Sequence, residues 1–512
     1  MAKEYSRQEV LSFLSQADVA TVATASGEEM RTRMMHFAVD EDFTVYLATM
    51  KGDPKTLQMT HHPSASLLVH RSQEDINLSR ETEISGTPQL IRDEREREKA
   101  LRLTYQKSPV VKYLVDSGNA QVLDCIKVVP RWAKYRVFGD IVQGMPPTVI
   151  EFPENRQVVS DWGLLKKKLA LLFRETRAPF LTASAVPVLL GTAIAWAYLG
   201  SLNWGLFLLA LIAGVLLHAG TNIANDYFDH LSRNDELNRE FVRPFSGGSR
   251  LIQLGLLSPL EVLTESLVCF VLGSLIGLYL AWVVGPWILA LGVFAILSGF
   301  FYTGRPFNWA SRGAGEALVG LNFGPLMVLG AYYVQTQSFG WVPLVASLPV
   351  GLLIAAVLYI NEFPDYAADK AVGKKTWVVR AGRQRAVFVY AAIMGMVYLF
   401  LLAGVVAGML PLAALLMAIT LPLAARAITY TRKYYHSSFD LAPANALTVT
   451  SHLAVGLVLT WVYVWQAVGG NLLYGVAIGL AFLGFVAYMY RHVEKQKNVF
   501  HGLKAAVGGG EG

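Results

Sequence analysis

The chain has 512 residues, of which 54% are hydrophobic and 16% charged, whereas soluble domains carry roughly 25% charged residues. Residues 1–168 hold 46 of the Asp, Glu, Lys and Arg side chains, and residues 169–512 hold the other 36. This composition excludes a wholly soluble enzyme and an intrinsically disordered chain. With only two cysteines, Cys125 and Cys269, it also excludes a disulfide scaffold and suits a reducing compartment. We therefore expect a soluble first part followed by a membrane-embedded second part.

The net charge of +6 arises in the second part, which has 21 basic and 15 acidic side chains, because residues 1–168 carry 23 of each. An excess of this kind favours positive loops at a lipid surface over nucleic-acid binding, so no nucleic-acid partner is expected. The N-terminal sequence MAKEYSRQEV lacks an apolar core, and we expect no secretory signal peptide.

Residues 1–150 are predicted to form a small barrel of short antiparallel strands. The turn signals SGEE and DEDF separate the first β-rich runs, and further strands are expected at 65–71 and 82–91. A charged amphipathic helix is expected over 92–106, and two more strands within 122–138 close the region.

Residues 151–177 are predicted to be an amphipathic linker. One helical face carries four apolar side chains, Trp162, Leu165, Leu169 and Leu172. Lysines at 166–168 flank this face, so we expect an interfacial helix on the bilayer surface, with a plain linker helix as the alternative.

Residues 178–490 contain ten apolar runs, each long enough to span the hydrocarbon core. They lie near 178–200, 203–224, 262–284, 286–303, 314–335, 341–361, 386–408, 410–430, 445–468 and 471–490. The remaining residues, 491–512, are expected to form a tail.

The charges of this part are distributed to one side. No charged residue occurs in the turns at 201–203, 285–287, 336–340, 409–411 and 469–471. Nearly every charge falls in the opposite set of loops, at 225–261, 304–316, 362–385 and 426–440 and in the tail. The positive-inside rule places this set, the N-terminal domain and the C-terminus in the cytoplasm, and predicts a multi-pass protein of the cell membrane.

Acidic clusters end the second and sixth apolar runs. In GTNIANDYFDHLSRND, one helix face presents Asn222, Asp226 and Asp229. In LYINEFPDYAADKAVGKKTWVVRAG, a similar spacing relates Asn361, Asp365 and Asp369. Mg²⁺ takes one or two carboxylates and completes its shell with water and phosphates, so two facing clusters predict a metal-bound diphosphate. The alternative is that these acids are helix caps and surface loop charges.

Basic and phenolic side chains lie on the same predicted side, at Arg243, Arg250, Tyr302, Arg305, Arg312, Lys374, Lys375 and Arg380. Such groups stabilise a leaving diphosphate through charge-assisted hydrogen bonds. For any one of them, the alternative is that it only serves the positive-inside signal.

Three motifs carry a family resemblance. NDYFD, DYAAD followed by GKKTWVVRAG, and YTGRP followed by RGAGEALVGLNFGP resemble the UbiA-type intramembrane aromatic prenyltransferases over roughly 175–468. The spacing is most similar to the branch that acts on 1,4-dihydroxy-2-naphthoate. The resemblance implies a helical bundle in which Mg²⁺ and aspartates bind an isoprenyl diphosphate. Ionisation then gives an allylic carbocation, which attacks an electron-rich aromatic acceptor.

The same resemblance assigns roles to individual residues. It implies metal binding by Asn222, Asp226, Asp229, Asp365 and Asp369, and catalysis by Asp226, Asp229, Asp365, Asp369, Arg305 and Lys374. Two features depart from the family pattern. Arg233 stands where many members have an acid, with Asp235 two residues later, and a tenth run follows the usual nine.

The N-terminal region carries a second resemblance. RMMHFAVDEDFTVYLATMKGDPKTLQMTHHPSASLLV is similar to the FMN-binding split barrel of the pyridoxamine-5′-phosphate-oxidase-like superfamily, over about 5–140. This implies that Arg33 and Lys55 contact the FMN phosphate, with Thr49 nearby. It also implies that backbone groups of Met34 and Met35 face the flavin ring.

Two departures argue against vitamin B6 synthesis. Pro54 and Ala38 stand where the oxidase has basic residues, so the resemblance implies a flavin-binding or reductase module. Haem or a deazaflavin are alternative ligands. Such barrels usually dimerise, and a homodimer through the barrel is implied.

These patterns together predict a two-domain membrane enzyme. Its parts are an FMN-binding split barrel (1–150), an interfacial linker (151–177), an all-α transmembrane bundle of 9–10 helices (178–490) and a cytoplasmic tail (491–512). The predicted function is Mg²⁺-dependent transfer of an isoprenyl group to an aromatic, quinone-precursor-like acceptor, which the flavin domain reduces. The alternatives are a flavin-dependent membrane quinone reductase and prenyl transfer to a lipid alcohol. A transporter is disfavoured, because the acids gather at one mouth and not at the bilayer midplane.

Overall fold

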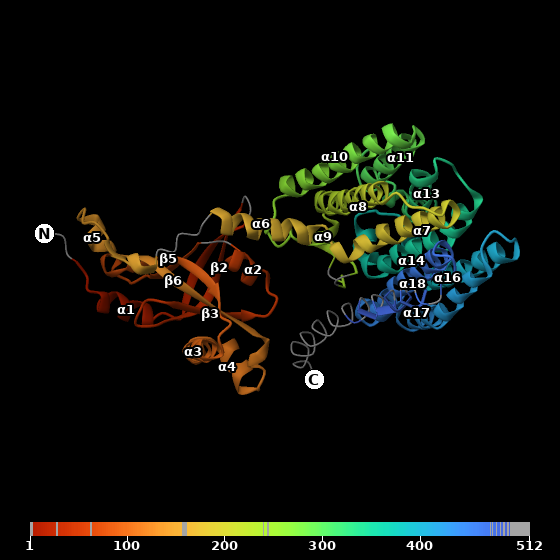
Figure 1. Ribbon diagram of the computed structural model, residues 1–512. Coiled ribbons are helices and arrows are strands. Elements are labelled where there is room, and N and C mark those ends of the chain that lie inside the picture. Colours follow the sequence, from red (N-terminus) through yellow and green to blue (C-terminus); the bar gives the residue numbers. More distant parts are fainter. Residues whose placement is uncertain are drawn as a thin grey trace. The chain divides into compact units, whose positions relative to one another are not determined.

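The computed structural model describes residues 4–26, 29–61, 64–155, 161–238, 240–242 and 245–471 and, with gaps, 473–491. It comprises two compact units, a strand-rich one in red and orange and a helical one in yellow to blue (Figure 1). The first runs to Leu171 and includes Leu254–Ser258. The second runs from Leu172 to Gln253 and continues from Pro259.

The first unit is an antiparallel barrel, as predicted. Its strands are β1 (Val19–Ser26), β2 (Glu29–Val39), β3 (Val45–Met50), β4 (Ala65–Arg71), β5 (Arg80–Leu90), β6 (Leu123–Val137) and β7 (Thr148–Glu151). They pair in the order β3-β2-β1-β4-β5-β6-β7, and pairing of β3 with β6 closes the barrel. Val22, Leu47 and Ile126 belong to its buried apolar core, because alternate side chains of a strand point inward.

The described part of the first unit also contains helices α1 (Arg7–Ser15), α2 (Pro54–His61), α3 (Glu94–Tyr105), α4 (Pro109–Asp116) and α5 (Phe138–Val142). The predicted charged helix is α3, which begins at the cap Asp93, whose side chain accepts from the backbone N–H of Glu96. The linker contains helix α6 (Asp161–Glu175). Leu165 and Leu169 on it are exposed, whereas the side chain of Trp162 lies outside the described residues.

The prediction of two strands within 122–138 is wrong, because β6 is one continuous strand of 15 residues. The register with β5 shifts at Ser85 and Gly86, so that Pro130 lies opposite Gly86 at the irregularity. Proline lacks an N–H and is tolerated at such bulges. Gly86 is required there, since a Cβ on it would lie 2.4 Å from the Val129 carbonyl oxygen.

The second unit is a helical bundle. Its long elements are α7 (Thr182–Leu199), α8 (Trp204–Leu231), α10 (Pro259–Val284), α11 (Trp287–Phe300), α14 (Trp341–Ala371), α16 (Arg383–Val406), α17 (Leu421–Tyr434) and α18 (Ser438–Ala467). Helices α12 (Gly315–Leu321) and α13 (Met327–Thr336) form one rod through a π-helical turn at Asn322–Leu326. Short helices α9 (Asn234–Leu237) and α15 (Trp377–Ala381) lie in the loops.

Nine of the ten predicted spans coincide with helices in the described residues. Eight are long and apolar enough to cross a membrane. Helix α11 has 14 residues, which rise only about 21 Å. The tenth predicted span, 471–490, falls where the structure describes the chain with gaps, and it stays a prediction.

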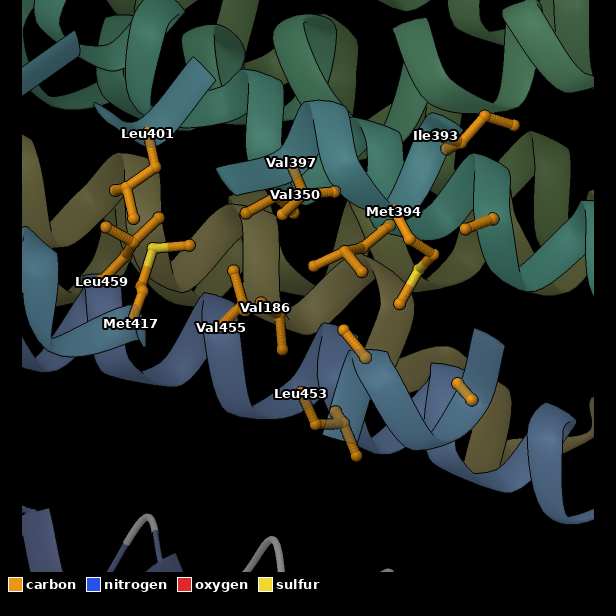
Figure 2. Packing of buried hydrophobic residues seen from close by; sticks show 14 of the residues in the cluster. Val186, Val350, Ile393, Met394, Val397, Leu401, Met417, Leu453, Val455 and Leu459 are labelled. Atoms are coloured by element: carbon orange, nitrogen blue, oxygen red, sulfur yellow. The ribbon is translucent and has the colours of Figure 1, made fainter. Parts of the chain in front are cut away.

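Apolar side chains from several helices interlock in the centre of the bundle. Figure 2 shows Val186 of α7, Val350 of α14, Met394 of α16 and Val455 of α18 in this cluster. Close packing of small and branched side chains holds helices together in lipid, where there is little hydrophobic drive for association. This core fixes the helices that surround the site described next.

Candidate functional site

The second unit encloses a cavity of about 600 Å³. Most of its wall is apolar, with Leu217 of α8, Leu291 of α11 and Phe323 of the π-helical turn among the lining residues. Polar side chains gather where α8 and α14 end, and they include Arg177, Asn222, Asn225, Asp229, Asn234, Asp235, Asn238, Asn361, Asp365, Asp369 and Lys374. The cavity therefore joins an apolar interior to a strongly polar mouth.

The two aspartates of the first acidic cluster lie in different surroundings on α8. Asp229 lines the cavity and accepts hydrogen bonds from Lys374 Nζ at 2.5 Å and from Asn225 Nδ2 at 3.1 Å. Asp226 is buried and contacts the Arg177 guanidinium and, at 2.8 Å, the backbone N–H of Ser249. Asp229 thus faces the cavity directly, whereas Asp226 anchors the surrounding loop.

The second acidic cluster is held by the loop that contains α9. Asp365 accepts from Asn238 Nδ2 at 2.6 Å, and Asp369 accepts from Asn234 Nδ2 at 3.1 Å. Lys374 Nζ lies 3.9 Å from Asp369. Since Lys374 also contacts Asp229, one ammonium group joins the two clusters that the sequence predicted to face each other.

Lys374 lies in the loop after α14 and is largely buried. Burial lowers its pKa, but the carboxylates of Asp229 and Asp369 outweigh burial, and the net pKa is above the ordinary value. The side chain therefore remains a cation and compensates the acids beside it.

Asp235 also lines the mouth, and the sequence had left its role open. Its side chain is buried and accepts from Gln253 Nε2 at 3.2 Å. Burial, with a further contribution from the charge of Asp229, raises the pKa of Asp235 to about 7.

Arg177 is a site residue that the sequence reading missed. It contacts Asp226 and lines the cavity, and burial lowers its pKa. The preceding Glu175 is buried against the Ser249 hydroxyl, and burial raises its pKa. A signal was present, because Arg177 stands immediately before the first apolar run.

The mouth suits a Mg²⁺–diphosphate better than a bare metal ion. Among the described residues, no three His, Cys, Asp or Glu side chains form a ready-made metal site. Asp229, Asp365 and Asp369 nevertheless offer hard carboxylate oxygens to one cavity. Mg²⁺ needs only one or two of them when phosphates and water supply the other ligands.

Other predicted basic residues lie elsewhere. Arg305 is exposed and is not among the residues that line the cavity. Arg380 instead braces a loop, donating to the backbone oxygens of Lys375 at 2.8 Å and Arg312 at 2.6 Å. Arg250 donates to the Asn238 carbonyl at 3.4 Å. Arg243 lies outside the described residues.

Two of the predicted phosphate donors of the barrel contact Asp53, and Arg33 lies near enough for its charge to interact with that carboxylate. Lys55 Nζ lies 3.1 Å from this carboxylate and Thr49 Oγ1 donates to it at 3.3 Å. Arg33 donates to Gln58 Oε1 at 2.8 Å and Thr24 Oγ1 at 2.5 Å. Burial lowers the pKa of Arg33, while the charge of Asp53 acts in the opposite direction.

This donor set fits a phosphate group, provided that Lys55 exchanges the Asp53 carboxylate for the phosphate. Met34 and Met35 lie beside it on β2, where the side chain of Met34 is exposed and that of Met35 is buried. In the described sheet, β3 pairs with β2 only at Phe37–Val39. The edge of β2 at both methionines therefore has no strand beside it on the β3 side.

Fold and site together define a multi-pass membrane protein with a polar-mouthed, apolar cavity. The model of the UbiA prenyltransferase family matches residues 184–448, more than half of the chain, and the chain belongs to this family. It is a prenyltransferase. The pyridoxamine 5′-phosphate oxidase model matches residues 6–125, so both predicted resemblances are confirmed.

Curated relatives share the bundle. The 2-carboxy-1,4-naphthoquinone phytyltransferase of Synechocystis sp. is 29% identical over 295 residues, 57% of this chain and 92% of the relative. The 1,4-dihydroxy-2-naphthoate octaprenyltransferase of Mycobacterium tuberculosis is 37% identical over 210 residues, 41% and 68% of the two chains. The protein of the same name from Bacillus subtilis is 29% identical over 238 residues, 46% and 74%.

Proposed function

We propose that this prenyltransferase moves an isoprenyl group from an isoprenyl diphosphate to an aromatic acceptor of the dihydroxynaphthoate type, with Mg²⁺ at the mouth. The supporting observation is the junction of two acidic clusters at Lys374, at the polar end of an apolar cavity. The names of the relatives support the acceptor class.

The chemistry follows from this arrangement. Cleavage of the bond between prenyl carbon and diphosphate oxygen leaves negative charge on the diphosphate, which Mg²⁺ and Lys374 would neutralise. Asp229, Asp365 and Asp369 would hold the metal, and Asp226 with Asn222 would support the first cluster from α8. The apolar wall would exclude water from the carbocation until the acceptor attacks it.

A transfer assay tests the proposal. Purified protein in detergent would receive Mg²⁺, radiolabelled geranylgeranyl diphosphate and a panel of dihydroxynaphthoate, hydroxybenzoate, hydroquinone and lipid-alcohol acceptors. We expect a prenylated naphthoate-type product that requires Mg²⁺ and is lost in D229N and D365N.

The matched control is D440N. Asp440 is an exposed acid near the start of α18 that accepts from Ser437 Oγ, and it does not line the cavity. We expect D440N to retain activity. If product forms only with a lipid alcohol, the acceptor is a lipid alcohol and not an aromatic compound. Full activity of D365N in EDTA would exclude the proposed metal site.

We further propose that the barrel binds a flavin, FMN or a related phosphate-bearing cofactor, through Arg33, Thr49 and Lys55. A bound flavin supplies electrons, and its role here would be to reduce an oxidised acceptor to the electron-rich hydroquinone. The observation that favours this is the cluster of cationic donors beside the free edge of β2.

Asp53 provides a direct test, because its carboxylate pairs with the Lys55 ammonium group that would otherwise bind the phosphate. We expect D53A to bind FMN more tightly and R33A to lose binding, measured by flavin fluorescence quenching. D42A is the control, since Asp42 is an exposed acid outside the cluster. No FMN binding by wild type or D53A would contradict the flavin proposal and leave haem or a deazaflavin to be tested in the same way.

The organisation in the cell is also a proposal. We propose a barrel over 1–150, an interfacial linker over 151–177, a bundle over 178–490 and a tail over 491–512. The barrel and the tail would be cytoplasmic, with barrels pairing as a homodimer. The distribution of loop charges supports the orientation. A membrane quinone reductase remains the competing function, and a flavin-loaded protein without transferase activity would favour it.

A further inference from the structure

A second pair of acids lies next to the cavity and takes no part in the diphosphate site. Glu316, the second residue of α12, and Glu362 of α14 are 1% and 6% exposed. Glu362 lines the cavity one turn before Asp365, about 4.5 Å further along the helix axis from the mouth. An acceptor that meets the prenyl carbon below the diphosphate would lie at this depth.

The two carboxyl groups lie close enough for their charges to interact. The Oε2 atom of each is buried, and among the described residues neither has a hydrogen-bond partner. Two ionised carboxylates that interact in a buried site repel each other, so the favoured state has a proton on one of them. A pair of this kind carries a single negative charge and can take up a second proton.

A backbone group at the start of α15 holds Glu316 in place. The N–H of Trp377 donates to Glu316 Oε1 at 2.5 Å. The indole N–H of Trp377 donates to the Gly313 carbonyl at 2.8 Å. Glu362 is the member of the pair that reaches the cavity, whereas Glu316 does not line it.

We propose that Glu362, positioned by Glu316, accepts the hydroxyl proton of the aromatic acceptor during prenyl transfer. This inference rests on the proposed aromatic acceptor. Loss of the hydroxyl proton pushes electron density into the ring and makes its carbon a better nucleophile, and the pair becomes neutral in an apolar site.

The step balances without a further reactant. The bond between the prenyl carbon and the diphosphate oxygen breaks, and its electron pair leaves with the diphosphate. A ring carbon forms the new bond to the prenyl carbon, the hydroxyl proton moves to Glu362, and the ring is left as a ketone. When that ring carbon loses a proton or carbon dioxide, the aromatic ring returns and its oxygen regains a proton from the pair.

The test compares full-length variants in detergent with Mg²⁺, geranylgeranyl diphosphate and 1,4-dihydroxy-2-naphthoate. We expect E362Q to lower kcat by about 100-fold or more, with the KM for the diphosphate nearly unchanged. The increase of kcat with pH in the wild type should disappear in E362Q. E316Q should lower kcat less and displace the pH profile, and E316D should restore part of the rate.

E240Q is the matched control. Glu240 pairs with Arg383 at 2.6 Å and accepts from Ser438, and it does not line the cavity. We expect unchanged kcat in E240Q, and melting temperatures of E362Q and E316Q close to that of wild type.

Four outcomes would overturn the inference. A wild-type kcat in E362Q overturns the inference by itself. So does a lower kcat in E362Q that comes with a lower melting temperature and an unchanged pH profile, because such a result shows a structural effect. Should E362Q fail to fold, an unchanged pH profile in E316Q decides against the pair. Absence of product from the wild type with every aromatic acceptor instead overturns the proposed function, and this inference with it.

Discussion

Single side chains at the mouth decide how two acidic clusters coexist. Asp229 and Asp369 come from helices far apart in sequence, and Lys374 contacts the first at 2.5 Å and lies 3.9 Å from the second. Buried carboxylates are costly unless they are paired. Amide groups of Asn234 and Asn238 satisfy further oxygens. An incoming Mg²⁺–diphosphate would therefore replace the existing contacts of these carboxylates with lysine and asparagine side chains, and it would not meet unpaired carboxylates.

Asp235 gives a prediction for pH. Its pKa is about 7 in the folded protein and about 4 in an unfolded chain. Because the pKa is raised, ionisation of Asp235 opposes folding, and stability falls as pH rises from about 4 to about 7. We expect D235N to melt above the wild type by at least about 2 °C at pH 8, and by less at pH 5, in detergent with EDTA.

The control for this prediction is D440N. Because Asp440 is exposed, the difference in melting temperature between D440N and the wild type should not depend on pH. A D235N gap of equal size at both pH values would show that lost ionisation is not the cause.

At the scale of elements, glycines bring α14 against the rod of α12 and α13. A Cβ on Gly351 of α14 would lie 2.5 Å from the Gly320 carbonyl oxygen and 3.1 Å from Gly324 Cα. Small residues spaced by four allow backbones in a membrane to approach this closely. The approach matters for the site, since Glu316 and Glu362 lie on the same two helices.

We expect G351A to destabilise the bundle by about 1–3 kcal/mol, because the added methyl group has no space. Thermal unfolding in detergent would measure this as a lower melting temperature. The control is G395A in α16, where a Cβ meets nothing within 4 Å and alanine favours the helix. Equal melting temperatures for G351A and wild type would contradict the close contact.

For the whole molecule, the family and the eight long apolar helices among its described residues make this a multi-pass membrane prenyltransferase fused to a barrel of the pyridoxamine 5′-phosphate oxidase family. The orientation can be tested by labelling newly introduced cysteines, since the native Cys125 is buried and the native Cys269 is partly buried. Exposed positions for new cysteines exist on both predicted sides, at Ser338 and His436.

In spheroplasts, a membrane-impermeant maleimide should label S338C and spare H436C, because positive loops stay in the cytoplasm. Both should react once the membrane is opened. The unmodified protein is the background control, and labelling of H436C in intact spheroplasts would reverse the proposed orientation.

The sequence alone determined the features that depend on local composition and spacing. Hydropathy located nine helices of the bundle, alternation located most strands, and helical periodicity put Asn222, Asp226 and Asp229 on one turn-spaced face. It failed at Pro130, because the register of two strands, and not the residue itself, decides whether proline fits a sheet. Arg305, to which the family resemblance gave a catalytic role, is exposed and does not line the cavity, and that role stays a prediction.

Only the tertiary structure decided which of these groups meet. Arg177 reaches Asp226 across 49 positions, Asn238 reaches Asp365 across 127, and Lys374 reaches Asp229 across 145. The pairing of Glu316 with Glu362 likewise depends on two helices crossing at glycines. Periodicity records which face of one helix a residue occupies, but the partner of that face is set by packing between helices, and packing leaves no local mark in the sequence.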